Sequence, residues 1–137
     1  HIESYNQFVN GRIQKILNEI GEIKPDLPGG EELVIKLGDV EIGDPIVKEA
    51  DGSMLKIYPN EARMRDLTYS ARVNVEMTPI FEGIKQPTET VTIGEIPVMI
   101  GSDICPTSEM TEEELIEAGE DPEDPGGYFI INGSEKS

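Results

Sequence analysis

The clearest pattern of apolar and polar positions lies between residues 67 and 77. Apolar and polar side chains alternate there without interruption: Leu67, Tyr69, Ala71, Val73, Val75 and Met77 alternate with Thr68, Ser70, Arg72, Asn74 and Glu76. Because successive side chains of a β-strand point to opposite faces, such alternation is typical of a strand with one buried face. The pattern therefore predicts a long, half-buried strand in an antiparallel sheet.

Shorter patterns predict further strands, at residues 33–42, 46–49, 54–58, 88–93 and 127–131. In the first of these the alternation slips by one residue at Gly38-Asp39, and a slip at glycine predicts a β-bulge. The two strands at 46–49 and 54–58 flank Asp51-Gly52, a pair suited to the positive φ angles of a tight hairpin.

Two segments carry helical patterns. The first forms one apolar stripe made by Ile2, Tyr5, Val9, Ile13, Ile16 and Ile20. Ser4 to Gln7 fits a capping box at its start, and Gly21 fits a C-terminal cap. A second capping box begins at Thr111, with three glutamates in a first turn whose dipole favours negative charge, and Gly119 ends that short helix. The predicted fold is α+β, with a mixed, mainly antiparallel sheet, an N-terminal amphipathic helix and a short second helix.

Both ends of the sequence predict an incomplete domain. Asn132-Gly133 favours a two-residue hairpin turn, yet only four residues follow it, so one arm of that hairpin is expected to be missing. The chain also begins at histidine rather than methionine. We therefore expect residues 1–137 to form a single excised domain, truncated at its C-terminal hairpin and lacking a strand of its sheet.

The charge of the chain is strongly acidic, with 11 basic and 28 acidic residues and a formal net charge of −17. Between Gln86 and Glu135 there are 13 acidic residues and no lysine or arginine. This balance argues against free binding to nucleic acid. Two interpretations stay open: a solvated surface that keeps the protein soluble, or an acidic face that docks on a basic partner or steers DNA away.

The sequence predicts no catalytic, cofactor-binding or metal-binding residue. His1, the only histidine, lies at a terminus, and Cys105 has no nearby cation to lower its pKa, so a buried or inert thiol is expected. The acidic cluster at 120–124 lacks the spacing of a calcium loop, which favours a solvated turn. A single cysteine, no signal-peptide layout and no long apolar run favour a cytoplasmic protein.

Three arginines depart from the acidic trend. Arg63 and Arg65 are two positions apart just before the long strand, so an extended backbone would point both to one face. Arg72 lies on the polar face of that strand. They either pair with neighbouring acids such as Glu61, Asp66 or Glu76, or contact a nucleic-acid backbone or a partner subunit.

Three stretches, in the same order as in the family, resemble the N-terminal region of the second-largest subunit of cellular RNA polymerases. They are Tyr58 to Ala71, Gly94 to Met99 and Pro125 to Lys136, and the opening Ser4 to Phe8 is similar as well. The form of Pro125 to Ile131, with the insert around Cys105 to Glu120, resembles the archaeal and eukaryotic branch.

This resemblance implies a protrusion domain, a non-catalytic wall of the cleft above the DNA–RNA hybrid in a DNA-directed RNA polymerase, which is a nucleotidyltransferase. It implies that the catalytic magnesium is held by the largest subunit. The implied partners are that subunit, the remainder of the second-largest subunit, the other subunits, DNA, the hybrid, a B-type initiation factor and NusG-type elongation factors, with no membrane. Arg63, Arg65, Arg72 and Lys136 are the candidate contact residues.

Two other classes of function remain as alternatives. A free acidic binding module resembling a DNA mimic would be a stable monomer that binds basic proteins without a polymerase. A small hydrolase would need a pocket in which two acids of raised pKa converge. The family motifs, which occur in order along nearly the whole chain, count against both.

Overall fold

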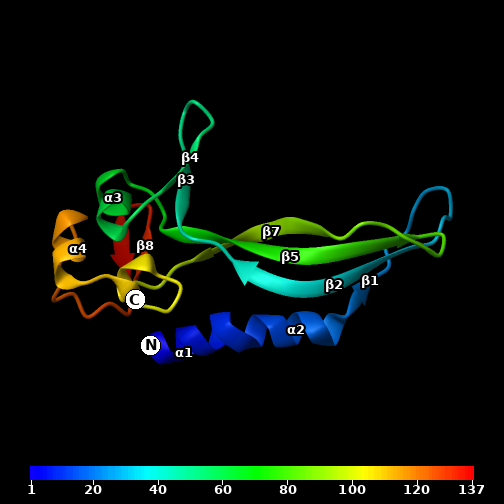
Figure 1. The fold of residues 1–137 in the computed structure, drawn as a ribbon, viewed down its shortest axis with the longest axis horizontal. Coiled ribbons are helices and arrows are strands. Elements are labelled where there is room, and N and C mark those ends of the chain that lie inside the picture. The colour runs from blue at the N-terminus through cyan, green and yellow to red at the C-terminus, as the bar shows by residue number, and fades with distance from the viewer.

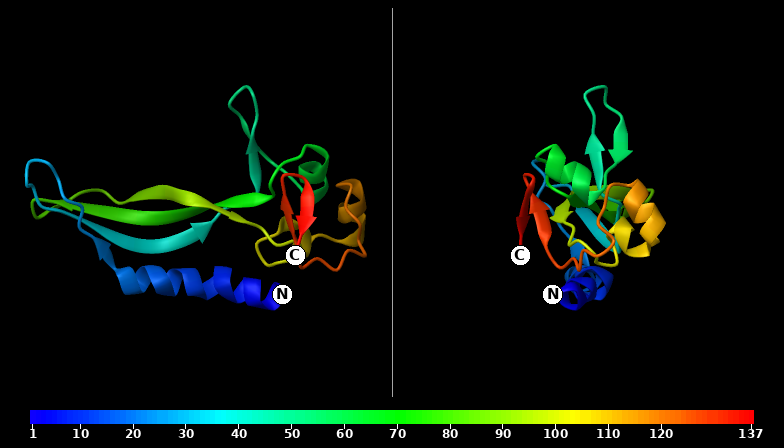
Figure 2. Two further views of the ribbon diagram at one scale, coloured as in Figure 1. Left: turned by 180° about the vertical axis from the view of Figure 1, so that it is seen from behind. Right: turned by 90° about the vertical axis from the view of Figure 1, so that its left-hand side faces the viewer.

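The computed structural model describes residues 1–137 and confirms a mixed α+β fold with mainly antiparallel sheets. Figure 1 shows two parts. A long curved sheet with a helix along one face, residues 1–43 and 70–97, is called the arm. A smaller group of helices and short strands at one end, residues 57–69 and 98–137, is called the head. Both termini lie at the head end (Figures 1 and 2).

The N-terminal helix is continuous from residue 2 to 20, as predicted, but it is not uniform. It consists of α1 (Ile2–Gln7), a π-helical segment η1 (Phe8–Arg12) and α2 (Ile13–Ile20). Gly21 ends it with a φ of 72°. The predicted capping box is wrong, because the helix already begins after His1 and no side chain caps it. Ser4 therefore lies inside the first turn.

The arm is an antiparallel sheet built around one central strand. Its strands are β1 (Glu22–Ile23), β2 (Leu33–Ile42), β5 (Ser70–Phe81), β6 (Ile84–Lys85) and β7 (Glu89–Pro97). The long alternating strand is confirmed as β5, although it begins three residues later than predicted and continues to Phe81. It pairs with β2 on one side and with β6 and β7 on the other. Its buried face carries Ala71, Val73 and Val75.

The predicted bulge in β2 is confirmed and is where the helix docks. The register between β2 and β5 shifts between Leu37 and Val40. The Gln14 side chain of α2 donates to the Gly38 carbonyl over 3.2 Å and accepts from the Val40 N–H over 2.8 Å. Backbone groups that the bulge leaves without ladder partners are thus satisfied by the helix.

An open apolar groove of about 290 Å³ lies between the helix and β7. It is lined by Phe8, Ile13, Ile16, Leu17, Val73, Ile93, Gly94, Glu95 and Ile96. Several of these side chains stay accessible, including Ile16 at 45% and Ile93 at 52%. The arm therefore has an apolar face that its own residues cover incompletely.

A second hairpin, β3 (Ile46–Lys48) and β4 (Met54–Lys56), projects away from both parts (Figures 1 and 2). The hairpin is confirmed, but the positive φ angle expected at Asp51 is wrong. The Asp51 carboxylate accepts from the Ser53 N–H over 2.9 Å, and only Gly52 takes a positive φ, at 89°. The Asp51 side chain thus anchors the turn.

The head contains α3 (Pro59–Met64), a 3₁₀ segment η2 (Pro106–Glu109), α4 (Glu112–Glu117), β8 (Phe129–Ile131) and β9 (Ser134–Lys136). Its core is one cluster of buried side chains: Ile57, Ala62, Tyr69, Ala71, Val98, Ile100, Cys105 and Ile130. The second capping box is confirmed, since Thr111 and Glu114 exchange side-chain to backbone hydrogen bonds of 3.1 and 3.2 Å.

The last hairpin has the predicted turn and more of its second arm than expected. Asn132 and Gly133 both take positive φ angles, 51° and 83°, which joins β8 to β9 directly. The expected missing arm is therefore wrong for residues 134–136, which pair with β8. A Cβ on Gly133 would lie 2.9 Å from the Asp66 Cα, so only glycine fits this close approach.

Candidate nucleic-acid and subunit interface

Arg63 and Arg65 do not lie on extended backbone, so the prediction that both point to one face is wrong. Pro59 occupies the first position of α3, where its fixed φ favours a helix, and Arg65 is the C-terminal cap residue. In a helix, residues two positions apart point in directions roughly 200° apart. The two guanidinium groups accordingly meet different partners.

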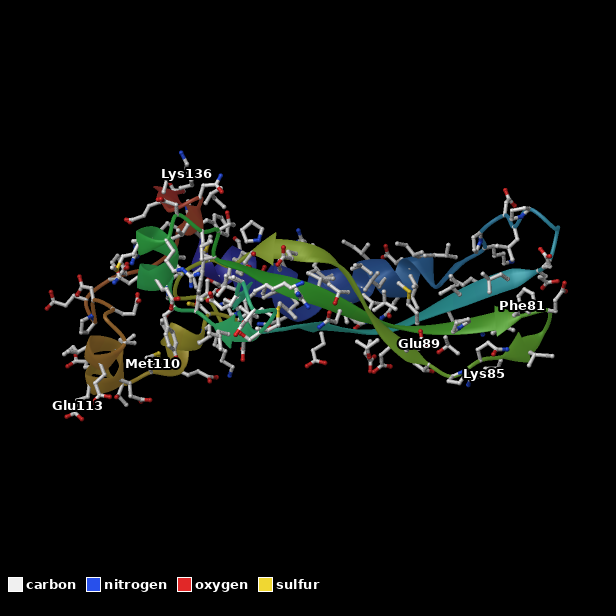
Figure 3. The ribbon with its side chains drawn as sticks, turned by 90° about the horizontal axis from the view of Figure 1, so that it is seen from above. Phe81, Lys85, Glu89, Met110, Glu113 and Lys136 are labelled. Atoms are coloured by element: carbon white, nitrogen blue, oxygen red, sulfur yellow. The ribbon has the colours of Figure 1, made fainter.

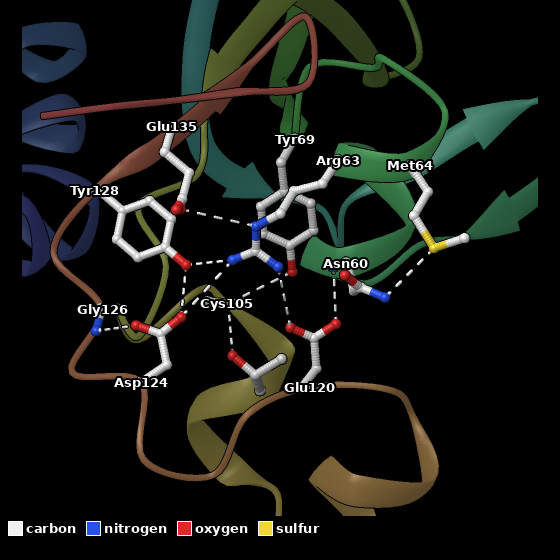
Figure 4. A network of polar contacts seen from close by, with 11 residues as sticks. Asn60, Arg63, Met64, Tyr69, Cys105, Glu120, Asp124, Gly126, Tyr128 and Glu135 are labelled. Atoms are coloured by element: carbon white, nitrogen blue, oxygen red, sulfur yellow. Dashed lines mark hydrogen bonds and ion pairs between the residues drawn. The ribbon is translucent and has the colours of Figure 1, made fainter.

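Arg63 lies at the centre of a polar network inside the head (Figure 4). Its guanidinium nitrogens lie 3.9 Å from Glu120, 3.7 Å from Asp124 and 3.9 Å from Glu135. The same group donates a hydrogen bond to the Tyr128 hydroxyl and lies 5.7 Å from the centre of that ring. Only 26% of the Arg63 side chain is exposed. Its charge is thus compensated from several sides within the chain.

The carboxylates of this network are themselves held in place. Asp124 accepts from the Tyr128 hydroxyl over 2.5 Å and from the Gly126 N–H over 2.8 Å. Glu120 accepts from the Asn60 N–H over 2.8 Å, at the first turn of α3. Burial raises the pKa of Glu120, against the opposing effects of the Asn60 N–H and of Arg63. The network fastens the 120–128 segment and β9 to α3.

The partners of Arg63 in this network could not be predicted from the local sequence. Arg63 and Tyr128 are 65 positions apart, and the acids named as neighbours, Asp66 and Glu76, do not pair with it. A partial signal existed, because Tyr128 and Glu135 lie in one family-like stretch and Arg63 in another. The structure shows that these two stretches meet in the head.

Arg65 is paired outside this network. Its guanidinium contacts both carboxylate oxygens of Glu49, at 2.9 and 3.2 Å, and one oxygen of Glu61 at 2.9 Å. Hydrogen bonding to Glu49, and then to Glu61, raises the pKa of Arg65. The expected pairing with Glu61 is confirmed. Because Glu49 belongs to the loop of the projecting hairpin, Arg65 ties that hairpin to α3.

Arg72 and Lys136 have no carboxylate within ion-pair distance. Arg72 lies in β5 directly opposite Glu95 of β7, yet the two side chains form no ion pair. Lys136 ends β9 and is exposed at the head (Figure 3). The four candidate cations therefore lie on three elements, α3, β5 and β9, and the two at α3 are neutralised within the chain.

Cys105 is fully buried, as expected. Its sulfur lies 3.4 Å from the Tyr69 hydroxyl and 3.0 Å from the Thr107 hydroxyl. Burial, and then the nearby thiol, raises the pKa of Tyr69.

None of the helices has both the length and the apolar character that a membrane span requires.

These features define an α+β domain whose charged side chains join segments that are distant in the sequence. Comparison with known proteins then identifies the family. The chain matches the family described as "RNA polymerase beta subunit" over residues 1–137, and it belongs to this family. The resemblance to the N-terminal region of the archaeal second-largest polymerase subunit is confirmed.

Three archaeal proteins illustrate this similarity. DNA-directed RNA polymerase subunit Rpo2N of Methanocaldococcus jannaschii is 54% identical over 98% of this chain. Subunit Rpo2 of Saccharolobus solfataricus is 48% identical over 99% of it, and Rpo2N of Halobacterium salinarum 46% over 99%. The chain spans 28% of the length of either Rpo2N and 12% of that Rpo2.

Proposed function

We propose that this domain is a non-catalytic structural part of a multisubunit DNA-directed RNA polymerase in the cytoplasm. It forms one wall of the cleft for DNA and the DNA–RNA hybrid, and it provides a docking surface for transcription factors. The observation that carries the proposal is the family match across the whole of residues 1–137. In this proposal the nucleotidyltransferase chemistry, with its magnesium, belongs to the largest subunit.

The partners follow from that role. The domain contacts the largest subunit, the remainder of its own subunit and other polymerase subunits, and it docks a B-type initiation factor and NusG-type elongation factors. Its acidic 86–135 segment faces solvent or basic partners, because 13 carboxylates without a lysine or arginine repel a phosphate backbone.

Arg72 and Lys136 are the better candidates for the nucleic-acid side. A cation contributes to phosphate binding when its charge is free to replace counterions. Arg63 is surrounded by Glu120, Asp124 and Glu135, and Arg65 by two other glutamates, so both are already compensated. The structure thus supports dividing the four candidates into two structural and two contact residues.

The test uses polymerase reconstituted with the full-length subunit. First, affinity capture of the tagged subunit is expected to recover the largest subunit, and recovery of the subunit alone would contradict the proposal. Then the salt dependence of template binding is measured for the Arg72→Ala, Lys136→Ala double variant. Each lost phosphate contact is expected to lower the slope of log K against log salt by about 0.9.

Lys85→Ala is the matched control, because Lys85 is exposed in β6 at the far end of the arm (Figure 3). Its slope is expected to equal that of the unmodified polymerase. If the double variant also keeps that slope, Arg72 and Lys136 do not contact nucleic acid.

A further inference from the structure

The outer face of the N-terminal helix carries two basic residues that form no ion pair within the chain. Figure 1 shows this helix along one face of the arm, with its other side turned away from the sheet. Arg12 and Lys15 are exposed, and neither lies within ion-pair distance of a carboxylate. Because residues 2–20 contain only Glu3 and Glu19 as acids, the helix is neutral in a chain of formal net charge −17. This surface therefore repels an anion far less than the acidic 86–135 segment does.

Neutral polar residues continue this surface along the helix. One set of exposed residues follows at spacings of three or four: Ser4, Gln7, Gly11, Lys15 and Asn18. Residues at these spacings are neighbours on the surface of a helix, so the five form one stripe, which we call the outer stripe. Hydroxyl, amide and ammonium groups such as these are donors that contact phosphate oxygens in protein–DNA complexes.

Gly11, at the centre of the outer stripe, relieves no contact within the chain. Its φ is not positive, and a Cβ at this position would meet no atom within 4 Å. Glycine inside a helix lowers the stability of that helix relative to alanine, so this residue costs stability without an internal return. It lies in the π-helical segment Phe8–Arg12, and such segments are frequent at functional positions. Both features indicate a place where an external group approaches the helix backbone closely.

We infer that the sugar–phosphate backbone of duplex DNA runs along the outer stripe, closest to Gly11, with Arg12 and Lys15 bound to phosphates beside it. The inference deepens the proposed function and rests on it, because a chain this acidic does not bind free DNA. The contact is separate from that of Arg72. Arg72 and Val73 point to opposite faces of β5, and Val73 lines the groove beside the helix.

Two observations favour duplex DNA over other partners. The outer stripe contains no apolar side chain, whereas the core of a protein interface needs aliphatic or aromatic anchors. Phe8 and Ile16 of the same helix line the groove instead. The outer stripe also contains no aromatic side chain on which the bases of a single strand could stack. Duplex DNA needs neither, because its bases are stacked inside and the contacts to its backbone are polar.

The first test is site-specific photo-crosslinking in transcription complexes reconstituted with the full-length subunit on labelled duplex DNA. Gln7→p-benzoylphenylalanine places the probe on the outer stripe without removing a charge. Glu113→p-benzoylphenylalanine is the control, on the exposed acidic helix α4 (Figure 3). We expect DNA-linked subunit at a yield at least fivefold higher from the probe at Gln7. If that probe links only to protein or to transcript RNA, or to neither, the inference is overturned.

The second test measures the salt dependence of DNA binding by the reconstituted polymerase. Arg12→Ala combined with Lys15→Ala is expected to lower the slope of log K against log salt by about 0.9 for each lost phosphate contact. The matched control is Lys48→Ala combined with Lys85→Ala, which removes the same charge from two exposed lysines away from the N-terminal helix. Equal slopes for the two double variants would overturn the inference.

Gly11→Ala separates an external contact from a structural role. Because alanine fits at this position and favours a helix, hydrogen exchange of residues 8–15 in the assembled polymerase without DNA is expected to slow at least twofold. The affinity for duplex DNA is expected to fall at least threefold. Faster exchange would give Gly11 a structural role, and unchanged affinity would show that no DNA backbone approaches it. Either result would contradict the inference.

Recovery of the largest subunit is scored in every sample. If the unmodified subunit fails to assemble, the proposed function is contradicted. Normal assembly without a DNA link from Gln7 contradicts only the inference about the N-terminal helix.

Discussion

The head buries its apolar side chains in a closed core, whereas the arm leaves many of its apolar side chains exposed. The head surrounds one closed cluster that includes Tyr69 and Ile130, both fully buried, and it fastens its surface segments through the Arg63 network. The arm is a single curved sheet with one helix, and most of the exposed large apolar residues of the chain lie on it: Phe8, Ile16, Ile20, Ile23, Phe81, Ile84, Val91 and Ile93.

The difference reflects how many layers each part has. A sheet or helix must bury its apolar face against another layer, and a second face without a layer stays exposed. In the head, α3, η2, β8 and the start of β5 enclose the cluster from several sides. The arm has a helix on one face only (Figure 2), so many of its apolar side chains remain exposed. The head is thus the part whose apolar side chains the chain buries more completely.

The largest effect should come from the head core. Ile130→Ala removes a fully buried side chain, and we expect the free energy of unfolding to fall by about 2–5 kcal/mol. The matched arm variant Ile84→Ala, at 66% exposure, should change it by less than about 0.5 kcal/mol. Denaturant unfolding of both variants checks this, and equal losses would refute the division into a closed head and an open arm.

The Arg63 network should come next. Arg63→Ala leaves three carboxylates without their cation, one of them, Glu120, only 7% exposed, and we expect a loss of about 2–3 kcal/mol. Arg65→Ala removes two ion pairs at the surface, with Glu49 and Glu61, and should cost clearly less stability than Arg63→Ala. If the two variants lose the same stability, Arg63 is an ordinary surface arginine and its structural assignment is wrong.

The turn of the last hairpin tests how tightly the head is packed. Gly133→Ala combines a positive φ with a Cβ 2.8 Å from the Asp66 carboxylate, and should cost about 1–3 kcal/mol. Gly52→Ala has the same backbone strain at 89° but open space around it, so a loss of about 1 kcal/mol is expected. Thermal unfolding of the pair separates strain from packing, and a smaller loss for Gly133→Ala would contradict the close approach.

The smallest effect concerns pH. Burial raises the pKa of Glu120 in the folded state above its unfolded value, so the folded chain binds this proton more tightly. Its contribution is therefore most favourable below the unfolded pKa and declines as the pH rises through the folded pKa. Glu120→Gln should flatten that decline in the free energy of unfolding, whereas Glu113→Gln on the exposed face of α4 should not. If the free energy of unfolding depends on pH in the same way in both variants, burial does not raise the pKa of Glu120.

The sequence determined those elements that form through interactions between residues close to each other along the chain. The alternation from Leu67 to Met77 predicted β5, and the slip at Gly38 predicted the bulge in β2. The capping box of Thr111 and Glu114 predicted the start of α4. Asn132-Gly133 determined a turn because both residues tolerate positive φ. Each of these signals acts within a few residues, so it can be read without the fold.

Tertiary structure alone decided the partners of Arg63 and the point at which the N-terminal helix begins. The residue type of Ser4 suits a helix cap, but the helix begins two residues earlier, at Ile2. In its first turns, the Tyr5 hydroxyl donates to the Pro97 carbonyl over 2.5 Å and the Tyr5 ring packs edge-on against Phe129. Arg63 could have paired with any of 28 acids, and the packing of the 120–128 segment and β9 against α3 selected three. The physical reason is that both depend on which distant segments pack together, and no local propensity encodes that.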